Sequence, residues 1–463
     1  MEHRPVPREA WGPLLRLARL ATRPLDRFLH IQASSGIVLL VAAAVALLWV
    51  NSSFAGSYHA LWHIPLGLRI GGWGFERSLE WWVNDGLMVL FFFVVGMEIR
   101  REIAHGELSE LRRAALPLAA ALGGMIVPAA IFRFIATEPS TRVGWGVPMA
   151  TDIAFAVGIL ALLGKRVPPA LRVLLLALAV IDDLGAILVI ALFYSSAFVW
   201  KGLVLACAGL AGIFLFRFVG VRSKALYVLP SLLVWSGVYI TGVHPTIAGV
   251  IVGLLTPVEA WLDRSQFVSE LQGDLAKLED RELVGDKSVA ETLRKIDGAR
   301  REVISPAESL IESLHPWVAF GIMPLFALAN SGVDLRGASF QGESLLLAIG
   351  VSLGLVVGKP VGIVLLSFIA IKLGLAKLPK GLGMRELVVL GVVAGIGFTM
   401  SIFIAQLAFG VSPHLATAKL AILLGSAAAG GLALFLGRVL LKPCDPSAAM
   451  AETADEAESS TEA

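Results

Sequence analysis

The chain has 463 residues, of which 57% are hydrophobic and only 16% are charged, and its formal net charge is +2. Soluble globular proteins carry about 25% charged residues, so much of this surface must face something other than water. Apolar runs long enough to cross about 30 Å of hydrocarbon recur from Gly36 to Leu441. The composition therefore excludes an ordinary soluble domain and indicates an all-α polytopic membrane protein in contact with the lipid bilayer.

The chain begins with a basic segment, residues 1–30, that precedes the first apolar run. No clear small-residue cleavage site follows it, so a cleaved signal peptide is not predicted, and we expect an uncleaved cytoplasmic segment. Its six arginines are Arg4, Arg8, Arg16, Arg19, Arg23 and Arg27.

Twelve apolar runs, separated by charged residues or by glycine and proline, predict one transmembrane domain over residues 31–442. The eighth run is short, and its separation from the seventh depends on the break between Gly242 and Pro245. The predicted spans cover residues 34–51, 81–100, 114–135, 146–164, 171–195, 199–218, 225–242, 244–257, 315–332, 345–371, 386–409 and 415–441.

The distribution of lysine and arginine gives the orientation of these spans. With the N-terminus inside, 30 of the 38 basic residues fall in inward loops and tails and seven fall in outward loops. Because short cytoplasmic loops carry an excess of Lys and Arg, both termini are predicted to be cytoplasmic.

Three segments do not read as membrane spans. Residues 64–77 place a Gly-Gly step between two short alternating runs, which predicts a β-hairpin on the outer side. Residues 259–313 mix charges of both signs with apolar residues at helical spacing, which indicates a charged cytoplasmic loop that contains helices outside the bilayer. Residues 443–463 are small, polar and acidic, and we expect a disordered tail.

Ionisable residues inside a membrane span are candidates for function, because leaving them in hydrocarbon is costly. Asp182 and Asp183 are flanked on both sides by apolar residues, so the pair is predicted near mid-membrane. Adjacent helical residues point about 100° apart, so one carboxylate can face an ion pathway while the other pairs with Lys359. A purely structural salt bridge is the alternative, and it leaves one carboxylate over. The full set is Asp85, Glu98, Asp152, Asp182, Asp183 and Lys359.

Two adjacent carboxylates in a low-dielectric environment resist ionising together. Their hard oxygens also suit a monovalent cation, so that proton and cation compete for the same atoms, and this competition couples two opposed fluxes. The sequence has no nucleotide-binding loop, zinc motif or nucleophile elbow. We therefore expect transport driven by an ion gradient, with no enzyme activity, no cofactor, and no nucleotide or nucleic acid as partner.

Two spans look interrupted, one early and one late in the chain. Interrupted spans in corresponding positions of two halves mark binding sites in transporters. Helix ends that meet inside a bilayer expose dipoles, which nearby charges offset. Glycines that only permit close helix packing are the alternative. The residues concerned are Thr151, Asp152, Gly395, Gly397 and Thr399, with Lys359 as the second charge.

Other polar residues leave two interpretations open. His244 begins the eighth span and is either a proton sensor near neutral pH or a satisfied interfacial residue. Asn330 and Ser331 either line a pathway or bond between helices.

Six segments, ATDIAFAVGIL, IDDLGAI, GVHPTIAGVIVG, FALANSGV, VVGKPVGI and GIGFTMSIFIAQLAFG, occur in this order along the chain. Together they resemble the NhaA family of sodium/proton antiporters, and the similarity runs from about residue 30 to 441. The resemblance implies twelve helices with inverted three-helix repeats, in which the interrupted fourth and eleventh helices cross near the bilayer centre. It also implies a bacterial inner-membrane protein that dimerises through the hairpin near residues 64–77.

The resemblance further implies electrogenic, pH-regulated exchange of cytoplasmic Na⁺ or Li⁺ for external H⁺. Asp183 would be the main carboxylate for the cation and the proton, beside Asp182, which is releasably paired with Lys359, and Thr151 and Asp152 would lie nearby. The residues matched to the cytoplasmic mouth or to the pH response are Asp85, Glu98, Glu102 and His244.

Two other functions use buried acids. An intramembrane aspartyl protease needs aspartates on separate helices, whereas this pair is adjacent on one helix. A sodium-coupled organic-anion symporter of the same fold has no need for the combination of Asp182, Asp183 and Lys359. The loop at residues 259–313 is longer than the family pattern, so the pH set point is not predicted.

Overall fold

The computed structural model describes residues 32–441, apart from 71–72, 196–197, most of 261–301, 337–339 and 380. The predictions made for residues 1–30, for most of the charged loop and for residues 443–463 lie outside the described residues.

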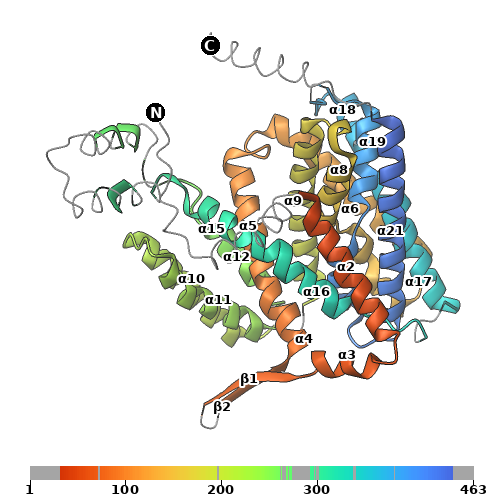
Figure 1. Ribbon diagram of the computed structural model, residues 1–463, viewed down its shortest axis with the longest axis horizontal. Coiled ribbons are helices and arrows are strands. Elements are labelled where there is room, and N and C mark those ends of the chain that lie inside the picture. The colour runs from red at the N-terminus through yellow and green to blue at the C-terminus, as the bar shows by residue number, and fades with distance from the viewer. Residues whose placement is uncertain are drawn as a thin grey trace, which may run out of the picture.

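The described chain is a helical bundle with one small hairpin at one end (Figure 1). Its first half contains α2 (Gln32–Val50), α3 (Ala55–Trp62), β1 (Pro65–Ile70), β2 (Trp73–Ser78), α4 (Leu79–Trp81), η2 (Trp82–Leu87), α5 (Met88–His105), α6 (Leu111–Ile135), α7 (Pro139–Arg142), η3 (Val143–Met149), α8 (Ile153–Leu163), η4 (Gly164–Arg166) and α9 (Pro169–Phe193). Its second half contains α10 (Trp200–Phe218), η5 (Lys224–Tyr227), α11 (Val228–Thr241), α12 (Thr246–Leu255), α15 (Pro306–Trp317), η7 (Val318–Ile322), α16 (Met323–Asn330), α17 (Gly342–Leu353), η8 (Gly354–Gly358), α18 (Lys359–Lys372), α19 (Met384–Ala394), α20 (Phe398–Phe409) and α21 (His414–Leu440).

The helices follow the predicted spans closely. Among the described residues, eight helices are long and apolar enough to cross a membrane, or up to eleven if each bent pair counts as one span. The predicted eighth span, residues 244–257, forms only the ten-residue α12. A helix of that length is about 15 Å long, about half the thickness of the hydrocarbon layer, so the structure does not confirm the predicted count of twelve.

The ninth span begins earlier than predicted. Its helix starts at Pro306 instead of residue 315, so the last part of the predicted charged loop belongs to it. Ser305 fixes this start, because its hydroxyl accepts a hydrogen bond from the Glu308 N–H at 3.2 Å. A cap of this kind satisfies one of the free N–H groups at a helix start, and it outweighs the local density of charge on which the prediction relied.

The hairpin predicted at residues 64–77 is confirmed. Strands β1 and β2 pair antiparallel, with Pro65 opposite Ser78. Phe75 lies edge-on to Tyr239 at the end of α11, with ring centroids 6.1 Å apart. Arg77 donates a hydrogen bond of 2.7 Å to the Tyr239 hydroxyl. These contacts hold the hairpin against the end of the α10–α11 pair.

Close helix crossings depend on glycine. Gly123 of α6 and Gly362 of α18 face each other so closely that a Cβ on either would overlap the carbonyl oxygen of the other. Gly96 of α5 lies in the same way against α12, where a Cβ would be 2.6 Å from the Val250 carbonyl oxygen. Small residues that let backbones approach are a general device of membrane helices.

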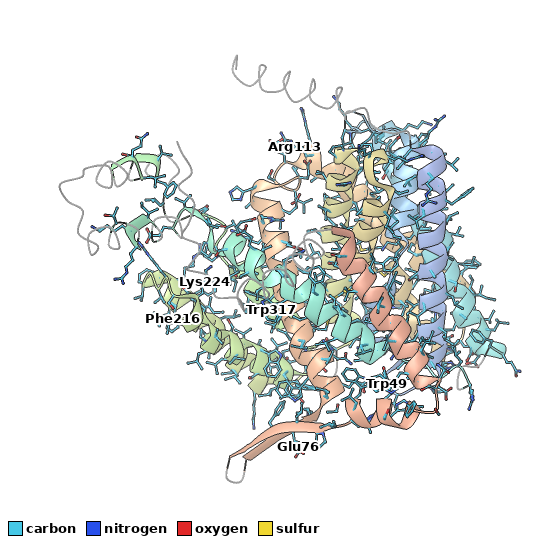
Figure 2. All side chains as sticks on the ribbon, viewed as in Figure 1. Trp49, Glu76, Arg113, Phe216, Lys224 and Trp317 are labelled. Carbon is cyan, nitrogen blue, oxygen red and sulfur yellow. The ribbon has the colours of Figure 1, made fainter. Side chains whose placement is uncertain are left out.

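The outer surface and the interior have opposite character. Large apolar side chains such as Leu48, Leu192 and Val204 are more than 70% exposed, as expected for a surface that faces lipid. Figure 2 shows Glu76 on the hairpin and Arg113 towards the opposite end of the bundle. Several polar and charged side chains are instead fully buried between the helices, and these form the candidate site.

The α6–α18 crossing predicts the effect of one added methyl group. Gly362→Ala should destabilise the protein by about 1–3 kcal/mol, the usual cost of overpacking, because the clash is with rigid backbone. Gly431→Ala in α21 is the control, since a Cβ there meets nothing within 4 Å. Thermal unfolding in detergent measures both, and equal shifts in the two variants would contradict this account of the crossing.

Candidate functional site

The site is built where two broken helices meet. One pair, Pro139–Met149 and Ile153–Arg166, bends by 46°, and the other, Met384–Ala394 and Phe398–Phe409, bends by 48°. The Asp152 N–H in the first break donates a hydrogen bond of 2.7 Å to a carbonyl oxygen in the second, that of Ile396. Both interruptions lie where the sequence places them, and they are in direct contact.

The Asp152 side chain caps the two helix N-termini at this crossing. Its carboxylate accepts hydrogen bonds from the Phe155 N–H at the start of α8 and from the Thr399 N–H at the start of α20, each at 3.1 Å. The Thr399 hydroxyl donates a further bond to the same carboxylate. Helix N-termini carry partial positive charge, so one buried acid offsets two of them.

The two helix C-termini are met by other side chains. The Lys359 ammonium donates to the carbonyl oxygen of Met149, the last residue of η3. The Thr151 hydroxyl lies 3.0 Å from the carbonyl oxygen of Ala394, the last residue of α19. A cation at a helix C-terminus is stabilising, so the crossing has a charge of the appropriate sign at each kind of end.

Gly395 and Gly397 let the second break approach its neighbours. A Cβ on Gly395 would lie 2.5 Å from the Leu355 carbonyl oxygen in η8, and one on Gly397 would lie 3.1 Å from the Ala150 carbonyl oxygen in the first break. Close packing, left open from the sequence as the alternative role of these glycines, is therefore real, and it is also what allows the two breaks to touch.

A buried ion pair lies directly beside the crossing. The Lys359 ammonium is 2.8 Å from Asp182 Oδ2, and neither side chain is exposed. The Thr151 hydroxyl donates to the same oxygen at 2.7 Å. Asp182 Oδ1 has no hydrogen-bond partner among the described residues. The pair thus joins α9 to α18 and, through Thr151, to the first broken helix.

Asp183 is the carboxylate that this pairing leaves over. Its side chain is 1% exposed, and its Oδ2 is buried without a hydrogen-bond partner in the part of the chain that the structure describes. Buried polar atoms are almost always satisfied. A cation bound at Asp183 would give this oxygen a partner, so Asp183 is a candidate ion-binding residue.

The four residues assigned to the cytoplasmic mouth or the pH response do not form one cluster. Asp85 pairs with His244 at 3.3 Å, close to the hairpin end. Glu98 lies towards the other end of the same helical segment, about 20 Å away at 1.5 Å per residue, and is 4.0 Å from His315. Glu102 accepts a hydrogen bond from the Glu107 N–H at 2.7 Å and thereby closes the turn after α5.

Asn84 and Gln406, whose side-chain amides bond to Asn330, were not singled out in the sequence analysis. Asn330 Nδ2 donates to Asn84 Oδ1 at 2.7 Å, and Gln406 Nε2 donates to Asn330 Oδ1. We call Asn84, Asn330 and Gln406 the carboxamide junction. Of the two interpretations of Asn330, bonding between helices is the one observed; the only sequence signal for its partners is an amide within each apolar run.

Comparison with known proteins identifies the family of this chain. Residues 26–436 match the family described as Na⁺/H⁺ antiporter 1. The chain belongs to that family. It is 61% identical over 459 residues to the Na⁺/H⁺ antiporter NhaA 2 of Myxococcus xanthus, a match that covers 98% of this chain and 97% of that protein.

A second relative of this chain is the Na⁺/H⁺ antiporter NhaA 2 of Sorangium cellulosum, which is 54% identical over 462 residues. The match covers 99% of this chain and 98% of that protein. The solved structure of the sodium/proton antiporter MjNhaP1 from Methanocaldococcus jannaschii superposes with a TM-score of 0.44 at 13% identity, over 92% of this chain and 95% of that one. Antiporters of this family are bacterial membrane transporters, not enzymes. They need no cofactor, and the ions that they carry are their substrates.

The buried ion pair predicts strong coupling between its members. Lys359→Met should destabilise the protein by roughly 3–5 kcal/mol, because it leaves Asp182 as an uncompensated buried charge. Adding Asp182→Asn should recover part of that loss by removing the second charge. Thermal unfolding of the two single variants and the double variant gives the interaction energy, and strictly additive effects would contradict the pairing.

Proposed function

We propose that the chain exchanges cytoplasmic Na⁺ or Li⁺ for external H⁺, in an electrogenic and pH-regulated cycle. The observation that carries this proposal is Asp183, a buried carboxylate whose Oδ2 has no hydrogen-bond partner among the residues that the structure describes, beside the Lys359–Asp182 pair. Its position next to the contact between the two broken helices supports the same function, because transporters build ion sites at such interruptions.

In the proposed cycle, proton and cation compete for Asp183 and Asp182. When the site faces the cytoplasm, it releases protons and binds Na⁺; when it faces outward, the exchange reverses. A cation held by both carboxylates draws Asp182 away from Lys359, whose ammonium then keeps only the Met149 carbonyl as a partner. The two carboxylates and Lys359 offer more than one exchangeable proton per cation, which makes the exchange electrogenic.

Asp152, Thr151 and Thr399 act on this site from the crossing. The Thr151 hydroxyl donates a hydrogen bond to Asp182, so a shift of the broken helix changes the position of Asp182 relative to Lys359. Asp152 and Thr399 hold the two helix N-termini together. In this proposal they position the carboxylates as the helices move between the inward- and outward-facing arrangements.

The proposed topology has twelve crossings, with α12 as the short eighth. The inverted repeats are the third to fifth and the tenth to twelfth spans, each with a broken helix in the middle, which are η3–α8 and α19–α20. Residues 31–442 form the transport domain in the inner membrane, both termini are cytoplasmic, and β1–β2 lies on the outer side.

Two further parts of the proposal concern regulation and assembly. Because Asp85 and His244 are paired near the hairpin while Glu98 and Glu102 lie at the other end of α5, the pH response would involve two separate places. The projecting hairpin (Figure 1) would join two copies of the chain into a homodimer. A sodium-coupled organic-anion symporter is not favoured, because Lys359, the cation at this site, is already paired with Asp182.

Reconstituted vesicles test the proposed exchange. With an internal pH dye and an imposed proton gradient, NaCl and LiCl should dissipate the gradient, faster as pH rises, while KCl should not. Asp183→Asn should abolish this response, since the amide cannot release a proton and binds a cation weakly. Asp334→Asn, an acid exposed in a loop, is the matched control and should behave as wild type.

Two outcomes would count against the proposal. One is a wild-type gradient that is indifferent to sodium, and the other is an Asp183→Asn variant as active as wild type. Uptake of an organic anion stimulated by sodium in the same vesicles would instead favour the symporter.

A further inference from the structure

The carboxamide junction ties together three elements that are far apart in sequence. Asn84 belongs to η2, Asn330 is the last residue of α16, and Gln406 lies in α20. Asn330 Oδ1 accepts hydrogen bonds from both Asn84 Nδ2, at 3.3 Å, and Gln406 Nε2. Asn330 Nδ2 donates to Asn84 Oδ1 and to the Phe326 carbonyl oxygen, at 2.7 and 2.9 Å. Asn330 is thus the centre of the junction, and it is fully buried.

The junction lies between the ion site and the hairpin end of the bundle. Gln406 follows Thr399 by two turns of α20, about 10 Å along the helix. Asn84 comes a few residues after β2, so the junction is on the hairpin side of the crossing. The end of α16 is held in place by α3, because the Tyr58 hydroxyl lies 2.8 Å from the Leu328 and Ala329 carbonyl oxygens.

The elements on the two sides of the junction have different packing partners. α20 packs chiefly on η3 and α21, within the group that holds the broken helices. α16 packs chiefly on α2, and η2 runs directly into α5. The bond from Gln406 to Asn330 therefore joins the second broken helix to α16, whose main partner α2 packs in turn on α8 of the first broken helix. Any movement of α20 relative to α16 has to break or stretch this bond.

We propose that the carboxamide junction is an outer gate, and that exchange with the outside requires the Gln406–Asn330 bond to open. This inference rests on the proposed function, in which the site faces the two sides of the membrane in turn. Neutral amides suit such a gate, because a hydrogen bond between neutral groups adds only modest net stability. Once parted, the amide oxygens also offer neutral ligands to a cation on its way out.

Cysteine labelling from the outside tests the gate directly. Ser331 adjoins Asn330, is fully buried, and its hydroxyl has no hydrogen-bond partner among the described residues, so Ser331→Cys removes no observed bond. In a background without Cys207 and Cys444, an impermeant thiol reagent added outside should label this thiol slowly. Adding Gln406→Leu should raise the labelling rate by about fivefold or more, the change expected from one lost hydrogen bond.

Two matched controls separate gating from general loosening. Gln341→Leu alters a glutamine exposed before α17 and should leave the rate of Ser331→Cys unchanged. Ser367→Cys places a thiol at another buried serine, in α18 beyond Lys359, whose hydroxyl has no hydrogen-bond partner in the described structure. Gln406→Leu should not change its labelling. An unchanged rate at Ser331→Cys, or an equal rise at Ser367→Cys, would overturn the gate.

The same vesicles distinguish this proposal from the antiport on which it rests. If wild type itself is inactive, the proposed function fails, whatever the labelling shows. If exchange is intact and labelling does not respond to Gln406→Leu, only the gate fails.

Discussion

Four helix ends meet in the buried centre of this bundle. The rest of the site follows from the need to give their free backbone N–H and C=O groups hydrogen-bond partners. Each free N–H or C=O group costs several kcal/mol in an apolar environment. The structure meets this cost with very few side chains: Asp152 accepts from the starts of α8 and α20, while Lys359 donates to the end of η3. Close approach of the breaks in turn requires Gly395 and Gly397.

Ion exchange is connected to this structural requirement through Lys359. Its ammonium is bonded to both the Met149 carbonyl and Asp182, so that it compensates a helix end and a carboxylate together. Asp183, adjacent on α9, has no hydrogen-bond partner for Oδ2 within the described part of the chain. Because a buried ion pair adds little net stability over apolar packing, the pair does little to strengthen the fold, and in the proposed function it leaves Asp183 free to exchange ions.

Much of this could be predicted from the sequence, for physical reasons that differ between residues. Long apolar runs fixed most spans, and lone charges within them, Asp152 and Lys359, pointed to the broken helices because buried charge needs compensation. Helical structure was predicted around Pro306, but not that this helix runs without a break into the ninth span; the Ser305 cap fixes where it begins. The role of Gln406 could not be predicted, because a neutral amide in an apolar run has no distinctive pattern. Its partners on η2 and α16 come next to it only in the folded structure.

The central claim is that Na⁺ and protons compete for the same buried carboxylates. The most direct test adds NaCl to purified protein in weakly buffered detergent solution and follows the release of protons with a pH dye. The account predicts that sodium binding releases protons, that its apparent affinity rises with pH, and that Asp183→Asn suppresses both effects. Sodium binding, seen as a shift in unfolding temperature, without proton release at any pH would contradict it.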